Sequence, residues 1–145
     1  MLFRSAKHPP KSTGLEHFNP AWLERSLDGH AQAAPVDVEA TLLELTASTI
    51  VDAAALAAPD AQRFILCGGG ALNSALVRRL GQSIAPAAVE SSDAHGIAPQ
   101  WVEAAGFAWL ARARLCGAPG NIPSVTGARE SAQLGGVYSG SRRNA

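Results

Sequence analysis

A short apolar run that stops at three consecutive glycines constrains the fold of this chain more than any other feature. The run spans residues 63–67 and has the length of a buried strand, and Gly68, Gly69 and Gly70 end it abruptly. Leucines spaced by four predict a helix over 72–80, directly after the glycines. A strand, a tight turn and a helix in this order predict an α/β fold with few short strands flanked by helices.

Periodicity and cap residues predict the other elements. Asn19, followed by Pro20, is typical of a helix start, and Asp37 is expected to cap the longest helix of the chain. Segments 31–35 and 91–99 are polar or proline-containing and are expected to be a linker and a loop. We expect helices at 20–30, 37–57, 72–80 and 100–116, and strands at 63–67, 87–90 and 133–138.

The composition fits one globular domain. Of 145 residues, 47% are hydrophobic and 17% are charged, which is enough apolar material for a core. Twelve basic and twelve acidic residues cancel, so the charge gives no indication of a nucleic-acid partner. We find no signal peptide and no apolar window of membrane-span length, and we therefore expect a cytoplasmic protein without a membrane partner. Cys67 and Cys116 lie in apolar runs and are expected to be buried and reduced, and no metal site is predicted.

The glycine turn is the first candidate for a binding site. Three residues without Cβ atoms let a ligand pack against the backbone, and the following helix offers unpaired N–H groups that favour a phosphate. The turn matches neither the GxGxxG pattern nor the Walker loop, because no Lys-Ser/Thr pair follows it. A plain strand-to-helix turn therefore stays open as the alternative.

Two further segments carry reactive side chains. Residues 91–96 contain serine, aspartate and histidine, but working triads are assembled from distant segments, so a polar loop is the better interpretation. Glu103 lies at the start of an otherwise apolar helix. It is either a carboxylate that complements the helix dipole or a functional carboxylate.

Four groups of residues, taken in order, resemble one known family. They are Lys11-Ser12-Thr13-Gly14 with Phe18-Asn19 and Trp22-Leu23; Asp37-Val38-Glu39-Ala40-Thr41-Leu42; Cys67-Gly68-Gly69-Gly70-Ala71 with Asn73; and Glu103-Ala104 with Phe107-Ala108-Trp109-Leu110 and Pro119-Gly120-Asn121. The chain resembles the C-terminal part of the anhydro-N-acetylmuramic acid kinases over nearly its whole length. Each group alone is weak, and their order makes the resemblance specific.

The resemblance implies a fold and an activity. The fold is a partial C-terminal lobe of an actin-like/Hsp70-like sugar kinase fold (ribonuclease H-like). Residues 1–19 would be an extended arm, 20–140 the nucleotide-binding lobe and 141–145 a disordered tail. The family uses ATP and Mg²⁺ to phosphorylate 1,6-anhydro-N-acetylmuramic acid while water opens the anhydro ring. The product, N-acetylmuramic acid 6-phosphate, feeds bacterial cell-wall recycling.

The resemblance also implies roles for particular residues. Gly68, Gly69, Gly70 and Asn73 would contact the nucleotide, and Glu103 would contact the sugar. Catalytic residues would come from an N-terminal lobe outside this sequence, so we expect the chain to be inactive alone and to pair with that lobe or with further copies of itself. The alternative is a stand-alone nucleotide-binding or protein-interaction module without catalysis.

Overall fold

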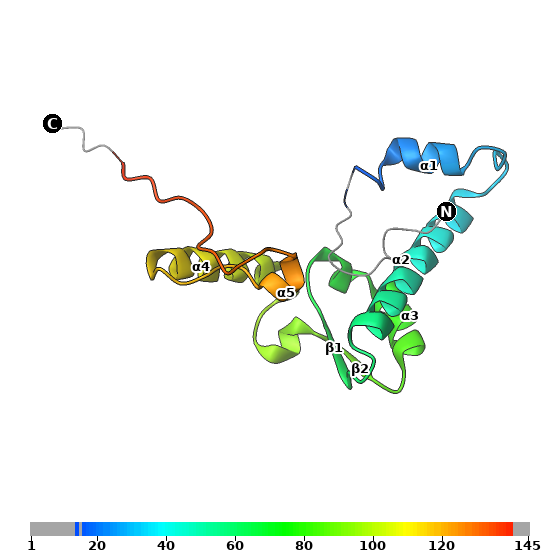
Figure 1. Ribbon diagram of the computed structural model, residues 1–145. Coiled ribbons are helices and arrows are strands. Elements are labelled where there is room, and N and C mark those ends of the chain that lie inside the picture. The colour runs from blue at the N-terminus through cyan, green and yellow to red at the C-terminus, as the bar shows by residue number, and fades with distance from the viewer. Residues whose placement is uncertain (1–13, 15, 141–145) are drawn as a thin grey trace. The chain divides into compact units, whose positions relative to one another are not determined.

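The computed structural model describes residue 14 and residues 16–140. The chain divides into two compact units, residues 1–102 and 103–145, and each is described here by itself. The first unit contains both strands and the glycine turn (Figure 1). The helices are α1 (Pro20–Ser26), α2 (Pro35–Ala57), α3 (Ser74–Ile84), α4 (Val102–Leu115) and α5 (Pro123–Thr126), and the strands are β1 (Arg63–Leu66) and β2 (Ala88–Ser91).

The two strands form a parallel sheet with α3 as the crossover between them. Phe64 pairs with Val89 and Leu66 with Ser91 in the strand register. One face of the sheet is covered by α2 and α3, as Figure 1 shows, and the core of this unit lies there. Ala47, Leu76 and Leu80 are buried, with Val51, Leu66, Ile84 and Val89 packed around them. The predicted α/β class is confirmed, whereas two strands do not define the actin-like lobe, which stays a prediction.

Exposure alternates along β1 because successive strand residues point to opposite faces. Arg63 and Ile65 are exposed, and Phe64 and Leu66 are half-buried. Cys67 continues the exposed phase, so its thiol is exposed, and Cys116 is exposed after the end of α4. Both cysteines are free, but the prediction that they are buried is wrong. Residues 63, 65 and 67 share the sheet face opposite the two helices.

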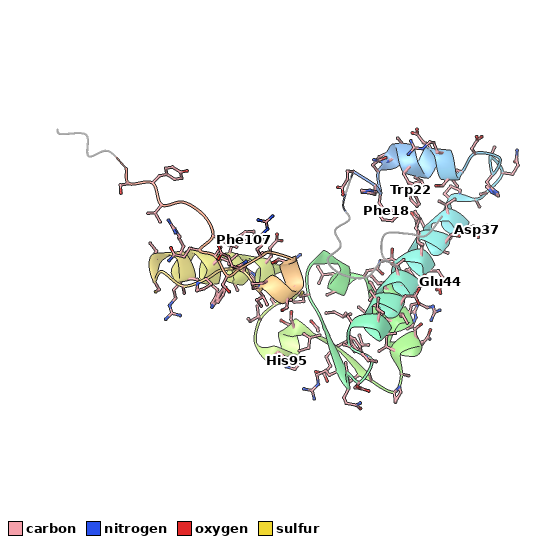
Figure 2. All side chains as sticks on the ribbon, in the orientation of Figure 1. Phe18, Trp22, Asp37, Glu44, His95 and Phe107 are labelled. Carbon is pink, nitrogen blue, oxygen red and sulfur yellow. The ribbon has the colours of Figure 1, made fainter. Side chains whose placement is uncertain are left out.

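The predicted start of α1 is confirmed in atomic detail. Asn19 Oδ1 accepts a hydrogen bond from Trp22 N at 2.9 Å, as an N-cap side chain should. Phe18 packs edge-on against Trp22, with ring centroids 5.1 Å apart, and Figure 2 labels both rings at this end of α1. The helix ends at Ser26, four residues earlier than predicted.

The predicted cap of α2 is wrong. The helix begins at Pro35, with Ala34 at the N-cap position and no side-chain cap hydrogen bond. Proline suits the first helical position because its fixed φ is already helical. Asp37 therefore lies inside the first turn, where its charge favours the positive end of the helix dipole.

Elsewhere in the chain, through α4, the expected elements are present, but their first and last residues differ from the predicted ones. A 3₁₀ turn, Gly69–Leu72, takes the first part of the helix expected at 72–80. The loop expected at 91–99 contains a 3₁₀ turn, Ser92–His95, and a third such turn, Pro99–Trp101, precedes α4. The predicted order of helices and strands holds through α4, and the short helix α5 was not predicted.

The strand expected at 133–138 is not a strand. In the second unit, Gln133 Nε2 donates to Gly117 O at 2.8 Å, and Gln133 Oε1 accepts from Arg114 at 2.6 Å. Gly120 N donates to Ala132 O at 3.0 Å, just before this segment. These hydrogen bonds hold the segment, which has no regular secondary structure, beside the C-terminal end of α4. Within the segment, Gly135 adopts a positive φ of 78°. Glycine in that conformation interrupts the extended backbone that a strand needs.

One helix is long and apolar enough to cross a membrane by length and composition alone. This helix is α2, with 23 residues and a mean hydropathy of 1.4 in its most apolar window. The prediction that no apolar window reaches the length of a membrane span is therefore wrong by length and composition. In the structure the helix buries Ala47 against α3, while 6% of this apolar window is buried and Val36, Ile50 and Leu56 are exposed.

Candidate functional site

The glycine turn lies at the carboxyl end of β1 and is tied to the segment after β2. Gly68 N donates to Pro99 O at 2.8 Å, and Ile97 N donates to Ser92 O at 3.2 Å nearby. Gly68 has φ 76° and ψ −174°, a conformation that glycine almost alone adopts. The backbone geometry of the turn therefore explains why glycine stands at position 68. Ligands of parallel α/β sheets bind at this end of the strands.

Gly69 has no such structural reason to be glycine. It begins the 3₁₀ turn with an ordinary negative φ, and a Cβ built on it meets no atom within 4 Å. At Gly70 a Cβ would make an ordinary contact with Leu76 Cδ2 at 3.7 Å. Neither backbone strain nor packing of the described chain requires glycine at 69. The open space beside its backbone is the space that a ligand in close approach would fill.

Asn73 caps α3. Its Oδ1 accepts from Ala75 N and Leu76 N, both at 3.1 Å. The side-chain oxygen is therefore used by the fold. The amide Nδ2 donates no hydrogen bond within the part of the chain that the structure describes, so it is the group that Asn73 can offer to a ligand.

A groove of about 390 Å³ adjoins this cap. Its α2 wall presents four residues spaced i, i+3, i+4 and i+7 along one face of the helix, and the N-terminal end of α3 supplies the other wall. The lining residues are Glu39, Leu42, Leu43, Thr46, Asn73 and Leu76. Ligand pockets are typically apolar concavities of this size with a few polar groups. The α2 wall was not predicted from the sequence, and none of its residues was expected to belong to a site. The spacing of Glu39, Leu42, Leu43 and Thr46 over two helical turns was the signal available.

An ion pair holds the two walls of the groove together. Arg79 of α3 donates to both carboxylate oxygens of Glu44 on α2, each at 2.6 Å. Arg79 also donates to Ser83 Oγ. The hydrogen bonds from Arg79 hold the pKa of Glu44 below its ordinary value and raise the pKa of Arg79. Figure 2 labels Glu44 on α2, midway along the helix.

The serine, aspartate and histidine of residues 91–96 do not form a triad. His95 Nε2 lies 2.8 Å from Glu90 Oε2, and Glu90 Oε1 pairs with Arg63 Nε at 3.1 Å. Ser92 is buried, and its hydroxyl has no hydrogen-bond partner among the described residues. Figure 2 labels His95 in this loop. The described residues thus contain no serine–histidine hydrogen bond on which a hydrolase could depend.

Glu103 is the first residue of the second unit and lies exposed in the first turn of α4. The structure brings Gly68, Gly69, Gly70 and Asn73 together in the first unit. The sugar contact of Glu103 stays a prediction. Among the described residues, no group of three His, Cys, Asp or Glu could hold a metal ion.

Comparison with known proteins identifies a family that matches this chain. The family model described as anhydro-N-acetylmuramic acid kinase matches residues 3–140. The chain is 49% identical over 130 residues to a protein of that name from Xanthomonas campestris pv. campestris, which covers 90% of this chain and 34% of the relative. It is 48% identical over 136 residues to one from Coxiella burnetii, covering 94% of this chain and 36% of the relative. A relative from Variovorax paradoxus is 50% identical over 133 residues, with 92% of this chain and 36% of the relative covered. The chain thus spans about a third of the length of these curated relatives.

Proposed function

We propose, from the premise that the chain belongs to the anhydro-N-acetylmuramic acid kinase family, that it supplies the nucleotide-binding part of an ATP-dependent sugar kinase. The whole enzyme would transfer the γ-phosphate of ATP to the 6-hydroxyl of 1,6-anhydro-N-acetylmuramic acid while the anhydro ring opens. The product would be N-acetylmuramic acid 6-phosphate, which makes the reaction a step of cell-wall recycling in the cytoplasm.

The observation that carries this proposal is the open backbone at Gly69. Gly68 is explained by its positive φ, but Gly69 has neither a strained backbone nor a neighbour that would exclude a side chain. A glycine without a structural reason, at the carboxyl end of a parallel strand, fits a turn that a nucleotide approaches closely. Asn73, three residues after the turn, also lines the groove between α2 and α3.

The proposal divides the reaction between this chain and the rest of the kinase. Gly68, Gly69, Gly70 and the amide of Asn73 would hold the nucleotide, and Glu103 would contact the sugar. Phosphoryl transfer depends on positioning and on neutralising phosphate charge with Mg²⁺. The described residues supply no cluster of acidic ligands for that ion, so the remaining part of the enzyme would supply it. The chain alone would bind nucleotide without turnover.

The exposed apolar side chains support the proposal that the chain binds a protein partner. Several large side chains lie open, among them Leu72, Trp101, Phe107 and Leu115, each more than 60% exposed. Leu72 and Trp101 belong to the first unit and Phe107 and Leu115 to the second, and large apolar side chains exposed in this way mark surfaces that a partner covers. The partner would be the remaining lobe of the kinase or, in its absence, further copies of this chain. Self-association would appear in light scattering as a mass above that of the 14.9 kDa monomer.

The test is a titration of the chain with ATP and Mg²⁺, followed by calorimetry and by chemical shifts of its backbone amides. Gly69→Val should abolish binding because its side chain fills the open space against the turn. Gly81→Val is the matched control, since a Cβ at Gly81 also meets no atom within 4 Å but lies on α3 away from the turn. Binding that survives Gly69→Val, or no binding at all, would count against the proposal. Phosphorylation restored only by a complementary lobe would separate the kinase from a stand-alone binding module.

A further inference from the structure

The geometry points to Glu39 as the residue that selects the sugar of the nucleotide. We infer that its carboxylate accepts hydrogen bonds from the 2′- and 3′-hydroxyls of a ribose bound in the groove between α2 and α3. This inference rests on the proposed nucleotide-binding function. It adds to that function a residue and a chemical preference that neither the glycine turn nor the cap of α3 provides.

The shape of the groove separates an apolar floor from a polar rim. Leu76 is 9% exposed and forms the floor, with Leu42 and Leu43 half-buried beside it. Glu39, Thr46 and Asn73 are exposed and line the same groove. A ligand in this groove would place an apolar surface against the leucines and polar groups toward the rim.

The other two polar side chains of the rim already make hydrogen bonds within the fold. Thr46 Oγ1 donates to Leu42 O at 2.8 Å, as helical threonines often do. Asn73 Oδ1 accepts the two N–H groups that open α3. Glu39 makes no hydrogen bond or ion pair within the described chain, whereas Glu44, five residues later on α2, is paired with Arg79. Glu39 is thus the charged lining residue whose two oxygens stay available to a ligand.

A free carboxylate at this place dictates which part of a nucleotide can face it. The phosphates are excluded because like charges repel, so they must lie away from Glu39, on the side of the glycine turn. A ribose carries two neighbouring hydroxyls, which match the two oxygens of one carboxylate. Acidic side chains recognise ribose hydroxyls in this way in other nucleotide-binding folds. Hydrogen bonds from hydroxyls to an ionised carboxylate are short and strong. A nucleotide without the two hydroxyls should therefore bind measurably more weakly.

The experiment compares ATP with 2′,3′-dideoxy-ATP, using amide chemical shifts of the whole chain, which detect weak binding. The unaltered chain should bind ATP at least about 10- to 100-fold more tightly, because the analogue loses both hydroxyls and the loss of one hydrogen bond to a charged group already has an effect of that size. Glu39→Ala should remove this preference, and alanine suits an exposed helical position, so the fold should be kept. Asp52→Ala is the matched control, because Asp52 is an exposed carboxylate of the same helix that does not line the groove.

The outcomes separate the inference from the function on which it rests. If ATP does not bind at all, the proposed function and this inference are both wrong. If ATP binds and Gly69→Val abolishes binding, but the two nucleotides bind equally or Glu39→Ala keeps the preference, only the role of Glu39 is wrong. If Glu39→Ala instead alters the choice between ATP and inosine triphosphate, which lacks the 6-amino group, the carboxylate contacts the base and the ribose contact is overturned.

Discussion

Replacing Gly68 and Gly69 separately by alanine should change stability in opposite directions. Gly68 has φ 76° and ψ −174°, a region that side chains with a Cβ enter only with strain of about 1–3 kcal/mol. Its Cβ would meet no atom within 4 Å, so backbone strain is the whole of the expected effect. Gly68→Ala should therefore lower the free energy of unfolding by about 1–3 kcal/mol.

The same substitution one residue later should stabilise the chain. Gly69 has no positive φ, and its Cβ would also meet no atom within 4 Å. Alanine then reduces the conformational freedom of the unfolded chain, which raises the free energy of unfolding by about 0.4–1 kcal/mol. Urea titrations followed by far-UV circular dichroism measure both values. Equal destabilisation by the two variants would refute the assignment of turn geometry to Gly68 and open space to Gly69.

Three further substitutions test the framework around the groove. Asn73→Ala removes the cap of α3 and should lower the free energy of unfolding by about 0.5–2 kcal/mol, while Asn73→Ser, which keeps a capping oxygen, should lose much less in the same urea titration. Leu80→Ala should cost about 2–5 kcal/mol because Leu80 is 1% exposed, and an equal loss from an exposed leucine such as Leu72→Ala would contradict that placement of the core. The pKa of Glu44 is lowered from 4.5 by its hydrogen bonds from Arg79, so its ion pair stabilises the fold above pH 4.5 and is lost as the pH falls through the lowered pKa. Thermal melts should therefore show a smaller loss of stability below pH 4.5 in Glu44→Gln than in the unaltered chain, and identical pH profiles would mean that the pair contributes nothing.

Local signals predicted most of the elements of this fold. The end of β1 is determined by the glycines that follow it, and the start of α1 by Asn19 and Pro20. These residues act on the neighbouring backbone, so both boundaries can be predicted from the sequence alone. The start of α2 was predicted wrongly for a reason of the same kind. Asp37 is a good capping residue, but Pro35 is already suited to the first turn, and the helix begins there.

The groove beside Asn73 could not be predicted in the same way. It exists because α2 packs on α3, and its lining residues Glu39 and Leu76 are 37 positions apart in the sequence. The prediction that the cysteines are buried was wrong for a related reason. Cys67 belongs to an apolar run, but strand alternation directs it to the sheet face opposite α2 and α3, where Ile65 is 50% exposed. Which face is covered depends on packing between distant segments, and one sequence does not contain that information directly.

The nucleotide proposed for the glycine turn would not cover the exposed apolar side chains of α4. A nucleotide at Gly69 would fill a small space beside backbone, whereas α4 carries Phe107, Trp109 and Leu115, each more than half exposed and spread around the helix. Large apolar side chains that stay exposed on a helix mark a surface that another protein segment covers, although α4 also carries Glu103, Arg112 and Arg114. ATP is too small and too polar to cover such a helix, so nucleotide binding alone leaves that surface unexplained. A stand-alone nucleotide-binding module would therefore need a second partner. In the function proposed above, the remaining lobe of the kinase would cover this helix and supply the remaining phosphate contacts; the chain spans 34–36% of its relatives.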